Sequence, residues 1–281
     1  MPGFEAGRDD HTVLNPTRRF VPILLAGLLL VPLSGSASAV TEPVTDAVLA
    51  QAGRDLVTLA NRQRAARGLV ALRMDPDVMA IARDRAEVMA ANDQMSHTEP
   101  NGQKVFDRLS DGGLTWYGAG EIIAWNHYPT EYSTAEAIRA WMASPGHRAI
   151  IVSTGYNYVG FGAAVSASGK RYYAGVFVKE PDETVPWARP GTISKRSIDA
   201  RHVRVTVRWT GGDTRLQVLT SGLRYFQVHW RAVGGEWHSW GTTTATARSV
   251  TFMRGVDYQV RVRSRDRAGN WGTWRFVSIN L

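Results

Sequence analysis

The sequence predicts an α+β domain followed by an all-β sandwich. The chain has 281 residues, about twice the ~100–150 residues of a typical domain. Apolar residues recur at three- and four-residue steps in the N-terminal half, where short apolar strands also occur. From Arg201 onward apolar and polar residues alternate strictly, which is typical of half-buried strands. Because the chain has no cysteine, both cores must be stable without disulfides.

The first 39 residues have the pattern of an export signal. Arg18 and Arg19 precede an apolar run over residues 20–33, and small residues end at Ala39. The run is shorter than the ~20 residues that a membrane-spanning helix needs. We expect residues 1–39 to be a signal peptide cleaved near Ala39, and the mature protein to be secreted or held at the cell surface. An uncleaved anchor is the less favoured alternative, and the true start codon stays open.

The α+β domain is predicted over residues 40–180. A first helix is expected to end at Gly68, and a second to begin with Asp75 as N-cap and Pro76 at the first helical position. Ser133 and Glu136 have the spacing of a capping box that opens a third helix, with Trp141 on its apolar face. Strands are expected at residues 121–125, 158–165 and 171–178.

A proline-rich linker is predicted over residues 181–191, and the β-sandwich over residues 192–281. Three prolines and Gly191 interrupt any regular element in the linker. Beyond it, apolar residues alternate with polar ones, as in the run from His202 to Trp209. Glycine-rich turns separate the strand candidates, which is typical of an antiparallel sandwich.

The positive charge is concentrated in the second domain. The whole chain has a net charge of +8, whereas residues 192–281 alone hold 15 Lys+Arg and 5 Asp+Glu, a net charge of +10. Outward strand positions carry Arg204, Arg208, Arg261, Arg263 and Arg265. They are either an ordinary solvated face or a surface for an anionic cell-wall polymer, a lipid headgroup or a polysaccharide. Four tryptophans offer stacking groups for the second alternative: Trp237, Trp240, Trp271 and Trp274. Nucleic acid is disfavoured, because export removes most contact with it.

Residues 56–177 resemble the CAP superfamily of cysteine-rich secretory, antigen 5 and pathogenesis-related proteins, especially its short bacterial branch. The resemblance rests on motifs in the family's order, at residues 61–62, 68–69, 86–89, 96–97, 102, 107–108, 120–124, 141–148 and 159–162. It implies an α-β-α sandwich with a surface cleft lined by two histidines and acidic residues. The matching positions are His97, Glu121 and His147. Larger members have a second glutamate where this chain has Ser144.

Two imidazoles and a carboxylate would suit zinc or another divalent cation, with water in the fourth position. We therefore expect the cleft to bind a divalent metal or a small apolar ligand. A structural role for each histidine is the competing interpretation. His127 and Ser144 are expected to shape the cleft, and a nucleophilic Ser144 is disfavoured because its neighbours do not form the Gly-x-Ser-x-Gly turn.

The final segment resembles a fibronectin type III module, an immunoglobulin-like sandwich. Trp209 occupies the place of the second strand's tryptophan. Residues 258–271 resemble the sixth strand and its turn, with Tyr258 as the corner tyrosine. Such modules space, orient or bind more often than they catalyse.

Two functional hypotheses follow. In the favoured one, the chain is a secreted binding protein whose cleft holds a metal or small ligand and whose basic module attaches to an anionic surface. In the alternative, it is a metal-dependent extracellular hydrolase acting on peptide or cell-wall substrates. A zinc hydrolase needs a carboxylate beyond its metal ligands. If Glu121 is a ligand, Ser144 leaves that role empty, so the sequence leans against catalysis.

Overall fold

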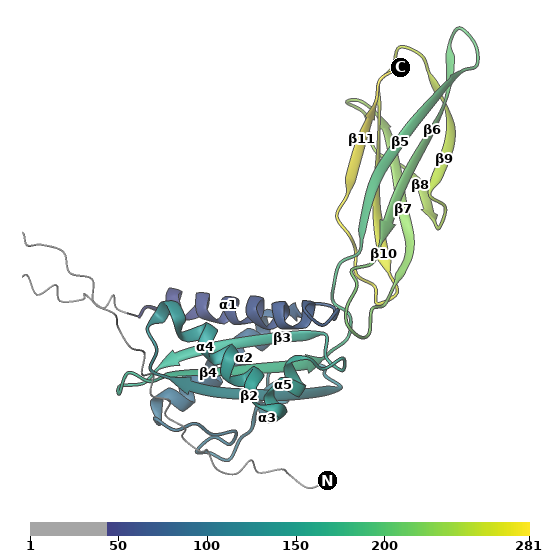
Figure 1. The fold of residues 1–281 in the computed structure, drawn as a ribbon. Coiled ribbons are helices and arrows are strands. Elements are labelled where there is room, and N and C mark those ends of the chain that lie inside the picture. Colours follow the sequence, from purple (N-terminus) through teal and green to yellow (C-terminus); the bar gives the residue numbers. More distant parts are fainter. Residues whose placement is uncertain (1–43) are drawn as a thin grey trace, which may run out of the picture. The chain divides into compact units, whose positions relative to one another are not determined.

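The computed structural model describes residues 44–281 (Figure 1). The predicted signal peptide and its cleavage site lie outside the described residues. No helix within residues 44–281 combines the length and apolar character needed to cross a membrane.

The first part of the described chain is a three-layer α-β-α arrangement. Its elements are α1 (Asp46–Ala65), β1 (Arg73–Met74), α2 (Pro76–Ala91), α3 (Val105–Asp111), β2 (Gly118–Asn126), α4 (Thr130–Ala143), α5 (Pro145–Ile151), β3 (Tyr158–Val165) and β4 (Arg171–Lys179). The sheet has the order β1-β3-β4-β2, in which β1 and β3 are parallel and the other neighbours antiparallel. Helices α1, α4 and α5 share a core with one face of the sheet, and α2 and α3 cover the other face. The three predicted strands lie within β2, β3 and β4.

Alternation along β3 explains why α2 approaches the sheet so closely. Phe161 faces the core shared with α1 and α4, while Gly160 and Gly162 face α2. A Cβ atom at Gly160 would lie 2.3 Å from the backbone of Val78, and one at Gly162 would lie 2.3 Å from Ala82. Only glycine permits this approach. The first two turns of α2 are therefore held close against the sheet.

Two predicted helix starts have different outcomes. The second helix begins as predicted: Asp75 Oδ1 accepts hydrogen bonds from the backbone N–H groups of Asp77 at 2.9 Å and Val78 at 2.8 Å. The predicted capping box at Ser133 is wrong, because α4 already begins at Thr130. Ser133 is instead buried inside the helix, and its hydroxyl donates to Asn126 Oδ1 at 2.7 Å. A tertiary contact has replaced the local cap.

Trp141 lies in the core, as predicted. It is 1% exposed, and its indole Nε1 donates to the Ile123 carbonyl at 2.9 Å. The bond satisfies the one polar atom of the ring, so α4 is fixed against the sheet.

The C-terminal part consists of antiparallel strands in two sheets. These strands are β5 (Trp187–Ser197), β6 (His202–Gly212), β7 (Leu223–Ala232), β8 (His238–Thr243), β9 (Ala247–Met253), β10 (Tyr258–Asp266) and β11 (Arg275–Ile279). One sheet has the order β11-β10-β7-β8 and the other β5-β6-β9. Their inner faces form one apolar core that includes Trp209, Phe226 and Val260. Tyr258 is buried, and its hydroxyl accepts a 3.4 Å hydrogen bond from the Met253 N–H.

Strand β5 begins inside the segment that the sequence assigned to a linker. It pairs with β6 from Trp187 onward, with a register shift between Pro190 and Ile193. Because β5 is an edge strand, a proline without an N–H can be accommodated there at an irregularity. The non-strand segment between β4 and β5 therefore covers only residues 180–186, and the prediction of a linker reaching Gly191 is wrong.

Candidate functional site

Glu121 lies in the middle layer of the first domain with both carboxylate oxygens engaged. Strand β2 carries it into a buried position, where its side chain is 3% exposed. Arg85 on α2 donates from Nε to Glu121 Oε1 at 2.8 Å and from Nη2 to Oε2 at 3.4 Å. His97 Nδ1 lies 2.7 Å from the same Oε2. The acid that the sequence placed in a cleft is thus the centre of a hydrogen-bonded group.

Arg85 also binds a second acid. Its guanidinium is fully buried and donates to Glu99 Oε1 at 2.9 Å, and Arg108 donates to Glu99 from the other side. Burial alone would lower the pKa of Arg85, but hydrogen bonds and charges from Glu121 and Glu99 outweigh it and raise that pKa. The hydrogen bonds from Arg108, together with Arg85, lower the pKa of Glu99 against the effect of burial. Two acids and two arginines form a charge-balanced network.

The two predicted histidines differ in environment. His97 has a side chain that is 56% exposed, and because a carboxylate only accepts hydrogen bonds, its Nδ1 carries the proton toward Glu121. In the neutral form of the ring, Nε2 is then an acceptor. His147 lies on α5, and burial lowers its pKa, with the nearby charge of His97 adding to the effect. Folding therefore brings His97 and Glu121 into contact and places His147 in their electrostatic neighbourhood.

The three side chains do not fit a zinc site in this arrangement. His97, Glu121 and His147 do not form a group of three ligand atoms within 4.8 Å of one another. Both oxygens of Glu121 already accept hydrogen bonds, one from a buried guanidinium. A metal would have to replace the ion pair with Arg85, at the cost of leaving that cation buried and unpaired. The site therefore provides a histidine ring that is oriented by a carboxylate.

Ser144 and His127, the two residues predicted to shape the cleft, lie in different parts of the domain. Ser144 joins α4 to α5, and its backbone carbonyl accepts from the Arg148 N–H at 2.9 Å. Its side chain makes no capping hydrogen bond to either helix. His127 follows β2 and lies six residues beyond Glu121, about 20 Å along an extended strand. It is exposed and lies edge-on against Trp125, and its role in shaping the cleft stays a prediction.

The predicted arginines lie on the outer faces of two different sheets. Arg204 and Arg208 are exposed on β6, whereas Arg261, Arg263 and Arg265 are half-buried on β10. The expected single basic face is therefore divided between the two sides of the sandwich.

The β10 arginines alternate with tryptophans in a continuous stack, which we call the Arg–Trp ladder. Arg261 lies 4.2 Å from the ring centroid of Trp237 and 4.4 Å from that of Trp274. Arg263 lies 4.6 Å from Trp274 and 4.0 Å from Trp271. Arg231 and Arg265 extend the two ends, over Trp237 at 4.5 Å and over Trp271 at 5.1 Å. The ladder thus consists of Arg231, Trp237, Arg261, Trp274, Arg263, Trp271 and Arg265.

No carboxylate among residues 44–281 lies within 4.0 Å of a ladder arginine. Burial lowers the pKa of Arg261, and the charges of Arg263 and Arg231 lower it further. Arg231 and Arg263 use only Nε in hydrogen bonds, to Gln259 and Gln227 respectively. Their terminal nitrogens therefore remain available to an anion.

Residues 57–178 match the model of the cysteine-rich secretory protein family, CAP. These residues form a CAP domain. The chain is 30% identical over 115 residues to uncharacterized protein YkwD of Bacillus subtilis, which is 41% of this chain and 43% of that protein. It is 29% identical over 126 residues to uncharacterized membrane protein YlbC of the same organism, which is 45% of this chain and 34% of that protein. The chain thus spans less than half the length of either relative.

Among solved structures, the chain is similar to an extracellular protein containing an SCP domain from Bacillus anthracis. The two share 24% sequence identity, with a TM-score of 0.40 and coverage of 46% of this chain and 41% of the other.

Sequence reasoning missed the partners of Glu121 in the CAP domain. Arg85 occupies the buried stripe of α2, between Ala82 and Met89 at three- and four-residue spacing. A charged residue on such a stripe requires a buried partner, and that was the available signal. Glu99 had no comparable signal, because it lies in the loop between α2 and α3 with no periodicity.

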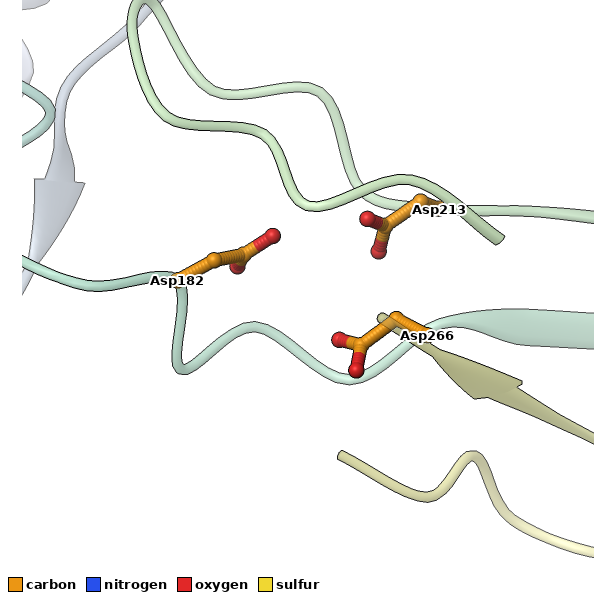
Figure 2. A group of neighbouring side chains, drawn as sticks. All are labelled: Asp182, Asp213 and Asp266. Atoms are coloured by element: carbon orange, nitrogen blue, oxygen red, sulfur yellow. The ribbon is translucent and has the colours of Figure 1, made fainter. Parts of the chain in front are cut away.

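The sequence also gave no indication of a group of three aspartates around the loops of the C-terminal part. Within residues 44–281, Asp182, Asp213 and Asp266 are the one group of three possible ligands with atoms within 4.8 Å of one another. Figure 2 shows their carboxylates directed into the space between them. Each accepts hydrogen bonds from loop groups, with donors on Thr184, Thr214, Ser221, Gly222, Gly269 and Asn270. These hydrogen bonds join the loops to one another, so the cluster has a structural role.

Proposed function

We propose that this chain is an exported binding protein whose C-terminal module attaches to an anionic surface glycopolymer through the Arg–Trp ladder. The observation that carries the proposal is the set of four stacked guanidinium groups without a carboxylate partner in the described residues. Like charges held side by side raise the local positive potential, and an anion would relieve their repulsion. The net charge of +10 over residues 192–281 supports the same conclusion.

The spacing of the ladder favours an extended polymer as the ligand. Arg261, Arg263 and Arg265 occupy every second position of β10, so their side chains repeat about every 6.8 Å along the strand. Guanidinium groups bind phosphate and carboxylate through paired N–H donors. Because tryptophan rings hold the guanidinium planes, little side-chain entropy remains to be lost on binding.

We propose that the C-terminal module is fibronectin type III-like. The division of its strands into sheets of three and four supports this, as does Tyr258 with its hydroxyl bonded to the Met253 N–H. In such a module the ladder occupies the outer face of the four-stranded sheet. Its role is then attachment of the CAP domain to a surface.

The CAP cleft is proposed to bind a small ligand. The support is His97, whose exposed ring is oriented by Glu121 and whose Nε2 is free to accept a hydrogen bond. The hydrolase alternative lacks a comparable observation, since Glu121 is committed to Arg85 and Ser144 has no hydrogen bond to a histidine. Location outside the cytoplasm is part of the proposal and rests on the export pattern in residues 1–39.

Fluorescently labelled dextran sulfate, with neutral dextran as the uncharged reference, tests the attachment proposal. The variant Arg261→Gln/Arg263→Gln should bind dextran sulfate about tenfold or more weakly than wild type, because it removes two charged donors. The matched control Arg204→Gln/Arg208→Gln loses the same charge from the other sheet and should bind like wild type. An equal loss of affinity for dextran sulfate in both variants would show that only the net charge matters, and this would contradict the proposal. Preferential binding to phosphatidylglycerol vesicles would instead identify a lipid surface.

A further inference from the structure

An acidic pocket lies at the start of α2, and none of its lining residues belongs to the His97–Glu121 group or to the ladder. It has a volume of about 200 Å³ and is lined by the turn before β2 and by the segment that follows β4. Four carboxylate residues line it: Asp75, Asp77, Glu180 and Glu183. None of the four is in an ion pair with a basic side chain of the described chain.

Glu180 is the unusual member of this group. It is 3% exposed, and its Oε1 is buried without a hydrogen-bond partner among residues 44–281. Its backbone is held on both sides by the buried Asn157, whose Oδ1 accepts from the Glu180 N–H at 2.9 Å and whose Nδ2 donates to the Glu180 carbonyl at 2.8 Å. These bonds fix the backbone from which the side chain extends, and an unpartnered buried oxygen is costly.

The charges around Glu180 have one sign. Burial raises its pKa to about 8, and the charges of Asp75, Glu183 and Asp77 contribute in the same direction. Asp75 uses Oδ1 to cap α2, and its Oδ2 makes no hydrogen bond within the described chain. The pocket thus contains a buried carboxyl with an unpartnered oxygen, among acids that a cation would neutralise.

We propose that this pocket binds one divalent cation of the Ca²⁺ type, with Glu180 as its buried ligand. Carboxylate and carbonyl oxygens are the ligands that Ca²⁺ prefers, and it tolerates irregular geometry. No three of the four carboxylates lie within 4.8 Å of one another, so binding must draw the exposed side chains of Asp77 and Glu183 inward. The ion would then join the start of α2 to the segment after β4.

Calorimetric titration of the full chain with CaCl2 at pH 7, after removal of trace metal, tests this proposal. Wild type should bind one ion. The variant Glu180→Gln should bind at least ~10-fold more weakly, as the loss of one charged ligand implies.

Glutamine has the shape and neutrality of protonated glutamate, so Glu180→Gln should fold, and its circular dichroism verifies this. The matched control Glu131→Gln removes an exposed acid from α4 and should behave as wild type. Equal affinity in wild type and Glu180→Gln would overturn the proposal and direct attention to the Asp182 cluster. Absence of binding by wild type up to about 10 mM, beyond the weakest extracellular calcium sites, would overturn it as well.

Discussion

Arg85 Nε lies 2.8 Å from Glu121 Oε1, with the arginine side chain fully buried and the glutamate 3% exposed. The pair joins α2 to β2 across 36 positions of sequence. It also orients His97 through the second oxygen of Glu121. A buried ion pair therefore sets the orientation of an exposed histidine.

Replacement of Arg85 by methionine should destabilise the CAP domain by about 3–5 kcal/mol, because it leaves buried carboxylates without their cation. Urea unfolding followed by circular dichroism measures the change. Arg83→Met on the same helix removes an exposed arginine and should change the free energy of unfolding by less than about 0.5 kcal/mol. A similar loss of unfolding free energy in the two variants would show that the buried network stabilises the domain no more than an exposed arginine does.

Zinc should not bind tightly at His97, Glu121 and His147. The carboxylate already accepts hydrogen bonds from Arg85 and His97, so the metal would gain two imidazoles at most. In competition with a chelator of micromolar affinity, wild type and His97→Ala should give superimposable zinc titrations. Zinc retained by wild type and lost in His97→Ala would restore the metal centre that the sequence suggested.

The stability of the protein should fall as pH rises through the range set by Glu180. Burial and neighbouring acids raise the pKa of this carboxyl from 4.5 to about 8. Between these values the folded state holds a proton that the unfolded state has released. The contribution is therefore fully present below pH 4.5 and is lost as pH approaches 8, with a size on the order of a few kcal/mol.

Urea unfolding of wild type and Glu180→Gln in EDTA, at several pH values from 5 to 9, measures this dependence. The variant should lack the decline and should exceed wild type in stability at the alkaline end. Glu131→Gln should follow the wild-type curve. Parallel curves for wild type and Glu180→Gln would show that the carboxyl titrates normally.

Trp274 should contribute to the stability of the ladder beyond its burial, because its ring lies between Arg261 and Arg263. Trp274→Ala should lower the free energy of unfolding of the C-terminal part by about 1–3 kcal/mol. Trp274→Phe keeps an aromatic face and should recover part of the loss. Thermal unfolding monitored by near-ultraviolet circular dichroism compares the stability of the variants. Equal stability of Trp274→Ala and wild type would show that stacking on Trp274 does not stabilise the ladder.

Much of the fold could be predicted from local pattern. The start of α2 at Asp75 and Pro76, the strand Tyr158–Val165 and the buried Trp141 follow from periodicity and capping chemistry, which depend on near neighbours in sequence. The failures have a common cause. Ser133 has the spacing of a cap but is buried inside α4, where its hydroxyl forms a hydrogen bond with the hydroxyl of Tyr173, 40 residues away. A partner so distant in sequence leaves no periodic trace.

The amino-acid sequence by itself determined the order of an α+β domain and an all-β module, the motifs of the CAP domain and the concentration of positive charge near the C-terminus. These properties depend on composition and short-range spacing. Only the tertiary structure decided that Arg85 pairs with Glu121 and that the arginines divide between two sheets. It also decided that Glu180 lies beside three acids with no basic side chain of the described chain paired to them. Each of these depends on which residues meet across helices and strands, because pair geometry and burial determine the free energy of a charge.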